Sequence, residues 1–174
     1  MSVCTSSCAP SETVLRKRNV IRNSYSVAEI YDRLSDELPV PRKRVLVADD
    51  QSRILDVVAD LLDESFDVIG TASDGQAALA ATLALEPDLL VLDVSMPGMS
   101  GIEVARKLRD HASTAKIVFL TVHEDAQIMA SCLAAGGLGY IVKELIDSDL
   151  VPAMNEALFG RVFVSHFSFR QGTS

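Results

Sequence analysis

Apolar and polar positions form two alternating patterns along the chain from residue 43 onward. Five short stretches are apolar at almost every position: RVLVAD (44–49), FDVIGTA (66–72), DLLVLDV (88–94), KIVFLTV (116–122) and GYIVK (139–143). Between and after them lie stretches with helical spacing, near residues 52–64, 75–86, 100–111, 124–135 and 147–159. Strands that are apolar on both faces and alternate with helices are typical of a parallel sheet covered on both sides. The pattern therefore predicts an α/β fold with a doubly wound, five-stranded parallel sheet over residues 43–160.

The first 25 residues show neither pattern. Residues 1–25 are rich in Ser, contain Pro10 and include a basic cluster, but they lack a regular period. Such a composition buries too little apolar surface to offset the entropy of ordering the chain. We therefore expect residues 1–25 to form an unstructured tail.

Residues 26–42 are different again. Ser26 and Glu29 have the spacing of a capping box, apolar residues follow at helical spacing, and Pro39 ends the run. This pattern predicts a short amphipathic helix followed by a linker. Its apolar stripe either docks on the domain at 43–160 or on a second copy of the chain, or the segment has no role.

Charge is distributed unevenly along a chain of net charge −8. Residues 1–44 hold eight Lys/Arg and five Asp/Glu. Residues 45–174 hold eight Lys/Arg and nineteen Asp/Glu. A domain this acidic is a poor partner for nucleic acid or an anionic membrane, but its carboxylates could bind a cation.

The sequence also lacks a signal peptide and any apolar run near the roughly 20 residues that cross a bilayer. We expect a cytoplasmic protein with no membrane or direct nucleic-acid partner, in which Cys132 is a buried helical thiol.

Polar side chains stand at the ends of four of the five predicted strands. Asp49 and Asp50 end the first strand, Asp93 the third, Thr121 the fourth and Lys143 the fifth. Each has an ordinary explanation when taken alone, since an Asp after a strand often caps the next helix. The carboxyl ends of parallel strands, however, meet at one edge of the sheet, where ligands bind. The joint placement therefore indicates one shared pocket.

Three carboxylates in one pocket repel each other, and a hard divalent cation relieves this repulsion. Mg²⁺ is the usual ion where water and phosphate oxygens complete the coordination. A carboxylate beside Mg²⁺ can attack a phosphoryl group and form an aspartyl phosphate, while a nearby ammonium stabilises the transferring oxygens. Asp93 is the expected nucleophile because its strand is central and the turn through Pro97, Gly98 and Gly101 leaves it accessible.

These residues resemble the receiver domain of two-component response regulators. The quoted motifs are ADD (48–50), LDVSMPGMSG (92–101), LTVHED (120–125) and GYIVK (139–143), within residues 43–160. Their spacing is most similar to the NarL-type subfamily. The resemblance implies a CheY-like fold with the flavodoxin-like strand order 2-1-3-4-5.

The resemblance also implies a phosphorylation site. Asp93 would accept the phosphoryl group from a histidine kinase or a phosphotransfer protein. Asp50 and Asp93, with the backbone carbonyl of Ser95, would ligate Mg²⁺, and Asp49 would help through a water molecule. No separate enzymatic activity is expected beyond Mg²⁺-dependent self-phosphorylation and slow autodephosphorylation.

By the same resemblance, other residues sense the phosphate. Lys143 would pair with the phosphoryl oxygens and Thr121 would move toward them. Tyr140 matches the aromatic switch residue that changes rotamer on activation. The output surface would be the face made by the fourth helix, the fifth strand and the fifth helix, used for a downstream protein partner or a homodimer.

Four neighbouring residues have more ordinary interpretations. Val122 is bulkier than the Ala or Gly that many receivers carry there, so we expect it to restrict access of water or a phosphatase. His123 could be a metal ligand or a catalytic group, but a solvated residue at the start of a helix is the preferred interpretation. Met96 and Met99 could form a ligand pair, but loop packing is preferred.

Three alternative functions are compared with this one. A phosphohydrolase of the haloacid dehalogenase type would require a second Asp two residues after the nucleophile, where this chain has Ser95. A partner-binding pseudo-receiver would typically lack acceptor or metal residues that are present here. Residues 161–174 are expected to form a C-terminal tail and are too few for a helix-turn-helix. We therefore expect a single-domain regulator that binds a protein or relays its phosphoryl group, with the remnant of a truncated DNA-binding regulator as the alternative.

Overall fold

The computed structural model describes residue 26 and residues 41–166. The predictions for residues 1–25 and for the amphipathic helix before Pro39 lie outside the described residues. Among the residues that are described, no helix is both long and apolar enough to cross a membrane.

One parallel sheet forms the centre of the fold, with the strand order β2-β1-β3-β4-β5-β6. The strands are β1 (Lys43–Ala48), β2 (Phe66–Ala72), β3 (Leu89–Asp93), β4 (Lys116–Thr121), β5 (Gly137–Val142) and β6 (Phe163–Val164). The predicted order of the first five strands is confirmed. The sixth strand was not predicted.

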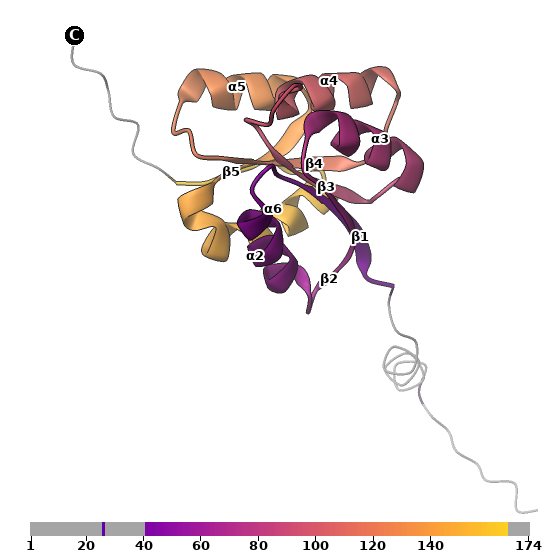
Figure 1. Ribbon diagram of the computed structural model, residues 1–174. Coiled ribbons are helices and arrows are strands. Elements are labelled where there is room, and N and C mark those ends of the chain that lie inside the picture. Colours follow the sequence, from indigo (N-terminus) through magenta and orange to yellow (C-terminus); the bar gives the residue numbers. More distant parts are fainter. Residues whose placement is uncertain (1–25, 27–40, 167–174) are drawn as a thin grey trace, which may run out of the picture. The chain divides into compact units, whose positions relative to one another are not determined.

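Five α-helices cover both faces of this sheet, as predicted. They are α2 (Ser52–Leu62), α3 (Gly75–Leu85), α4 (Gly101–Asp110), α5 (Ala126–Ala134) and α6 (Ile146–Leu158). Figure 1 shows α3, α4 and α5 on one face of the sheet and α2 and α6 on the other. A short 3-10 turn, η1 (Lys143–Leu145), joins β5 to α6.

Burial on both faces explains why the strands are almost continuously apolar. All five residues of β3 are buried, and along β1 successive side chains enter opposite cores. Leu46 packs in the core beneath α3, α4 and α5, whereas Val45 packs in the core beneath α2 and α6.

Cys132 is a buried free thiol, and burial raises its pKa to about 12. A thiol with so high a pKa stays protonated and packs as a small apolar group.

The sixth strand lies in the segment that was predicted to be a C-terminal tail, 161–174. After α6 the chain turns at Gly160, whose φ of 72° suits glycine, and then pairs in parallel with β5. Val164 is the register partner of Tyr140, and the backbone N–H of Ser165 donates to the Tyr140 carbonyl at 2.9 Å. A two-residue strand is too short to produce a recognisable period in the sequence.

Candidate functional site

The predicted site residues lie together at the carboxyl edge of the sheet. Asp49 directly follows β1, Asp93 ends β3, Thr121 ends β4 and Lys143 directly follows β5. The parallel direction of the strands brings them together, although more than ninety residues separate the first from the last. Of this set, Asp49, Asp93 and Thr121 are buried.

Asp49, Asp50 and Asp93 each offer a carboxylate oxygen, and these oxygens lie within 4.8 Å of one another. Asp49 and Asp93 are buried, whereas Asp50 is exposed, so the cluster opens to solvent on one side. One oxygen of Asp49, Oδ1, accepts a hydrogen bond from the Gln51 N–H at 3.0 Å. The other, Oδ2, is buried and lies 2.6 Å from the Lys143 ammonium. Carboxylate oxygens this close together suit a hard cation such as Mg²⁺, so this set could hold the ion.

Lys143 supplies the positive charge of the site. Its Nζ lies 2.6 Å from Asp49 Oδ2 and 3.1 Å from Asp93 Oδ1, and the side chain is 7% exposed. Burial alone would lower the pKa of this ammonium, but the two carboxylates more than offset that effect and the pKa is raised. Lys143 is therefore a cation in the site.

Asp93 is a buried carboxylate whose charge is only partly compensated. Burial raises the pKa of Asp93, and the charge of Lys143 only partly opposes this effect. Its Oδ2 also accepts a hydrogen bond from the backbone N–H of Ser95 at 3.2 Å. The chain must pass close behind Asp93, since a Cβ at Gly101 would lie 2.1 Å from the Asp93 carbonyl oxygen. The glycine at the start of α4 therefore lets the turn place Asp93 at the strand end.

The predicted switch residues contact the same loop, between β4 and α5. Thr121 Oγ1 accepts a hydrogen bond from the backbone N–H of His123 at 3.0 Å. The Tyr140 ring is fully buried, and its hydroxyl donates to the backbone carbonyl of His123 at 2.7 Å. Burial raises the pKa of this hydroxyl. The Tyr140 side chain thus points inward in this structure.

Two of the ordinary interpretations can be compared with the structure. His123 is exposed just before α5, as expected, but its Nε2 also lies 3.3 Å from Ser95 Oγ. Nothing in the sequence indicated this contact, because the two residues are 28 positions apart. Met96 is buried and Met99 is partly buried, and both pack against the core, which confirms the loop-packing interpretation.

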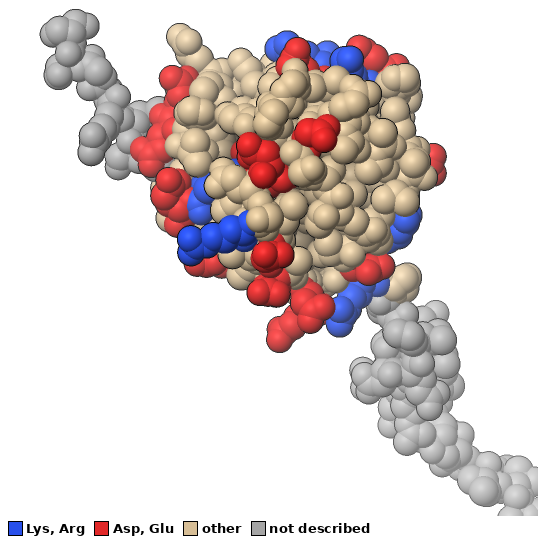
Figure 2. Space-filling view, in the orientation of Figure 1, with Lys and Arg blue, Asp and Glu red and all other residues tan. Residues whose placement is uncertain are grey.

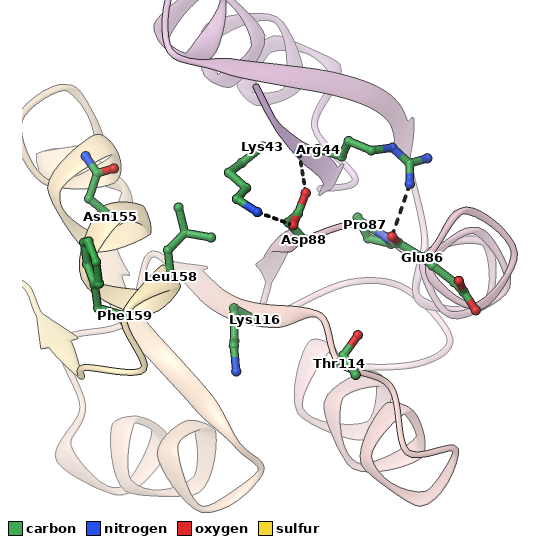
Figure 3. A pocket seen from close by; sticks show the side chains of 10 residues that line it. All are labelled: Lys43, Arg44, Glu86, Pro87, Asp88, Thr114, Lys116, Asn155, Leu158 and Phe159. Carbon is green, nitrogen blue, oxygen red and sulfur yellow. Dashed lines mark hydrogen bonds and ion pairs between the residues drawn. The ribbon is translucent and has the colours of Figure 1, made fainter. Parts of the chain in front are cut away.

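A separate pocket of about 730 Å³ lies at the opposite, amino edge of the sheet. Ten residues line it: Lys43, Arg44, Glu86, Pro87, Asp88, Thr114, Lys116, Asn155, Leu158 and Phe159. Figure 3 shows Lys43 and Asp88 pointing toward each other, and Lys43 Nζ lies 3.0 Å from Asp88 Oδ1. The Arg44 backbone N–H also binds Asp88, and it is the main reason that the pKa of Asp88 is lowered. The carboxylate there is already paired with Lys43 and with the Arg44 backbone.

The surface charge agrees with the composition of the domain. Figure 2 shows Asp and Glu side chains in several groups over the face in view, with Lys and Arg gathered mainly toward its edges. This distribution provides no broad basic surface on the visible face for nucleic acid.

Comparisons with known proteins agree with this geometry. A family model described as the response regulator receiver domain matches residues 45–155. The uncharacterized transcriptional regulatory protein YvfU of Bacillus subtilis is 36% identical over 72% of this chain and 64% of its own length. The nitrate/nitrite response regulator protein NarL of Escherichia coli is 32% identical over 70% of this chain and 57% of its own length. The chain thus spans about three fifths of these relatives.

Solved structures show the same fold. The signal receiver domain of the response regulator NarL from Mycobacterium tuberculosis has a TM-score of 0.67 and 32% identity, covering 70% of this chain and 99% of that one. The isolated REC domain of RcsB from Salmonella enterica was solved with the phosphomimetic BeF₃⁻. It has a TM-score of 0.66 and 25% identity, and the match covers 72% of this chain and 93% of that one. The matched part corresponds to the domain that contains the acidic cluster and Lys143.

Proposed function

Because the chain belongs to the response regulator receiver family, we propose that it accepts a phosphoryl group on Asp93 from a histidine kinase or a phosphotransfer protein. The observation that carries this proposal is the position of Asp93 at the end of the central strand β3. There it contacts the ammonium of Lys143 and lies within one acidic cluster with Asp49 and Asp50. A nucleophile, a cation and a metal-binding carboxylate set are the groups that aspartyl phosphate formation requires.

The transfer uses Asp93 as the nucleophile. A carboxylate oxygen of Asp93 attacks the phosphorus of a phosphohistidine, a P–O bond forms, and the P–N bond to the donor imidazole breaks. The leaving imidazole nitrogen keeps the bonding electron pair and takes a proton. Lys143, already 3.1 Å from Asp93, is positioned to stabilise negative charge on the transferring oxygens.

Mg²⁺ would be held by Asp50, Asp93 and the backbone carbonyl of Ser95, with Asp49 acting through a water molecule. When bound, the ion neutralises charge on the phosphoryl oxygens. The closeness of the Asp49, Asp50 and Asp93 carboxylate oxygens, within 4.8 Å of one another, supports a cation in this position. The exposure of Asp50 supports an open side for water and phosphate.

Signalling would follow from a phosphorylation-dependent change in conformation. Thr121 would donate a hydrogen bond to a phosphoryl oxygen, and Tyr140 would report this through the loop that both residues contact. Receiver domains are signalling domains, and the face made by α5, β5 and α6 lies beside both residues. We assign this face, on which β6 forms the edge of the sheet outside β5, as the surface for a downstream protein partner or a homodimer.

Labelling by a small phosphodonor tests the acceptor. With acetyl phosphate and Mg²⁺, the protein is expected to gain one acid-stable, base-labile phosphoryl group, measured by intact mass. Asp93→Asn should abolish the gain, whereas Asp67→Asn, at an exposed carboxylate of β2, should not change it. Equal labelling of Asp93→Asn, or labelling that continues after Mg²⁺ is chelated, would contradict the assignment.

A further inference from the structure

The amino-edge pocket, the pocket of about 730 Å³ described above, lies at the opposite edge of the sheet from the acidic cluster. The starts of β1 and β4, the loop before β3 and the end of α6 form it (Figure 3). Its volume falls within the range of pockets that hold small ligands. The proposed phosphoryl transfer does not use this pocket, so a ligand bound there would not compete with Mg²⁺ or phosphate.

Two of the three cations that line the amino-edge pocket have structural roles. Lys43 Nζ forms an ion pair with Asp88 Oδ1 at 3.0 Å. Arg44 Nη1 donates to the backbone carbonyl of Glu86 at 3.3 Å, directly after α3, where a cation suits the carbonyl groups of a helix C-terminus. Both cations are therefore engaged by groups of the protein.

Lys116 is the third cation, and its side chain has no hydrogen bond or ion pair with any of the described residues. It is exposed at the start of β4, and Figure 3 shows its ammonium pointing away from Asp88. The hydroxyl of Thr114 and the amide of Asn155 belong to exposed residues of the same pocket. One cation and two neutral hydrogen-bonding groups are thus available to an anionic ligand.

Phe159 provides an apolar surface in the same pocket. It directly follows α6 and is 74% exposed. The guanidinium carbon of Arg161 lies 4.8 Å from the centroid of its ring, and Arg161 is itself paired with Glu156, so the ring is ordered although it is exposed. Arg161 does not line the pocket, which leaves the pocket side of the ring open. Buried Pro87 and half-buried Leu158 continue this apolar surface.

We propose that the amino-edge pocket binds a small aromatic anion. The ring of the ligand packs on Phe159 and Leu158, and its carboxylate or phosphate pairs with Lys116. The charge distribution favours an anion: residues 41–166 hold ten Lys/Arg and nineteen Asp/Glu, whereas three Lys/Arg and only two Asp/Glu line this pocket. One of those two acids, Asp88, is already paired. The pocket is therefore a site of positive charge on an acidic domain.

Titration with simple aromatic anions tests the site. Amide resonances of the full chain, labelled with ¹⁵N, are followed without Mg²⁺ while 2-naphthoate or 2-naphthyl phosphate is added. Saturable shifts are expected around residues 114–116 and 155–159, with a Kd of about 1 mM or lower. The probe with the lower Kd identifies the anionic group that the pocket prefers.

Two matched probes separate the contribution of the charge from that of the ring. The first, 2-naphthalenemethanol, keeps the ring but has no charge, and decahydro-2-naphthoate keeps the charge but has no aromatic ring. Each should bind about fivefold more weakly than 2-naphthoate, because each loses one of the two contacts.

Variants remove the same two contacts from the protein. Lys116→Gln should raise the Kd of 2-naphthoate about fivefold and reduce its dependence on salt, since an exposed ion pair is weak and screened. Phe159→Ala should raise the Kd about tenfold. Two controls outside the pocket should leave the Kd unchanged: Lys107→Gln, at an exposed cation of α4, and Val162→Ala, at an exposed apolar residue.

Several results would overturn the proposal. Shifts that do not saturate by about 10 mM, tenfold above the expected Kd, would exclude a site for this class of ligand. Shifts centred on Lys143 and the acidic cluster would place the anion at the other edge of the sheet. A wild-type Kd in Lys116→Gln or in Phe159→Ala, or equal binding of the neutral probe, would refute the assigned contacts. The proposal does not depend on phosphorylation of Asp93, so failure of that labelling would leave it standing.

Discussion

At Asp93, the proposed acceptor, one ammonium lies between two buried carboxylates. Lys143 Nζ lies closer to Asp49, at 2.6 Å, than to Asp93, at 3.1 Å. Burial is the largest influence on Asp93 and raises its pKa, which means that the ionised form is disfavoured in the folded protein. The charge of Asp93 is thus only partly compensated, and a bound cation would relieve this condition.

This imbalance predicts that Asp93→Asn stabilises the protein without Mg²⁺. Removing the buried charge should raise the free energy of unfolding by about 1 kcal/mol at neutral pH. Because the folded-state pKa of Asp93 lies above its unfolded value, protonation stabilises the wild type as the pH falls through the folded-state pKa. The difference in the free energy of unfolding between Asp93→Asn and the wild type should therefore shrink as the pH falls through the folded-state pKa. Urea unfolding at a series of pH values measures it.

A control of opposite sign is available at the other edge of the sheet. The pKa of Asp88 is lowered, mainly by the hydrogen bond from the Arg44 backbone. Its carboxylate therefore contributes stability above its unfolded pKa, and this contribution is lost as the pH falls through the lowered folded-state value. Asp88→Asn should destabilise the protein at neutral pH. The same sign for both variants would refute the charge assignment at Asp93.

At the scale of the elements, β6 extends the sheet beyond β5, the strand that contains the predicted switch residue Tyr140. Only two residues pair with β5, so the strand depends on side-chain anchors. Ser165 is 2% exposed, and its hydroxyl donates to Asp149 Oδ2 of α6 at 2.6 Å. The other oxygen of Asp149 accepts from the Ser148 hydroxyl at 2.8 Å. A buried serine thus ties β6 to α6, next to Tyr140.

Ser165→Ala is expected to loosen β6. Loss of the buried hydrogen bond to Asp149 should lower the free energy of unfolding by about 1 kcal/mol. It should also speed hydrogen exchange at the Ser165 amide, which donates to the Tyr140 carbonyl. Ser148→Ala removes an exposed bond to the same carboxylate and serves as the matched control. Equal effects of the two variants on stability and exchange would show that β6 does not depend on the buried bond.

At the scale of the whole domain, the two edges of the sheet differ in chemistry. The carboxyl edge gathers the acidic cluster, Lys143 and Thr121, whereas the amino edge holds the pocket in which Asp88 is already paired. The carboxyl edge adjoins α5 through the loop that holds His123. A change at the acceptor can therefore reach the face made by α5, β5 and α6 over a short path.

Beryllofluoride with Mg²⁺, as a phosphoryl mimic, should shift amide resonances over the face made by α5, β5 and α6. A ligand shifts a conformational equilibrium only through contacts that differ between the states, and the bond from Thr121 to the mimic exists in one state alone. Thr121→Ala should weaken binding of the mimic about tenfold and reduce these shifts.

Thr114→Ala, at an exposed residue of the amino-edge pocket, should affect neither binding nor the shifts. Wild-type shifts that stay within the acidic cluster would contradict the proposed switch.

The sequence by itself determined the architecture and the membership of the site. Continuous apolar strands alternating with helices require a sheet buried on both faces, and the parallel direction then places Asp49, Asp93, Thr121 and Lys143 at one edge. Both inferences depend on local periodicity and on the direction of the chain. A single sequence contains this information without any knowledge of the distances between residues.

Tertiary structure alone decided how the charged side chains of the site pair and that β6 lies beside β5. The closer approach of Lys143 to Asp49, the inward ring of Tyr140 and the contact of His123 with Ser95 depend on side-chain packing between distant segments. The strand β6 depends on pairing with β5 and on the buried anchor of Ser165. Such contacts leave no periodic pattern in the sequence, because they arise only when separate loops and strand ends meet in space.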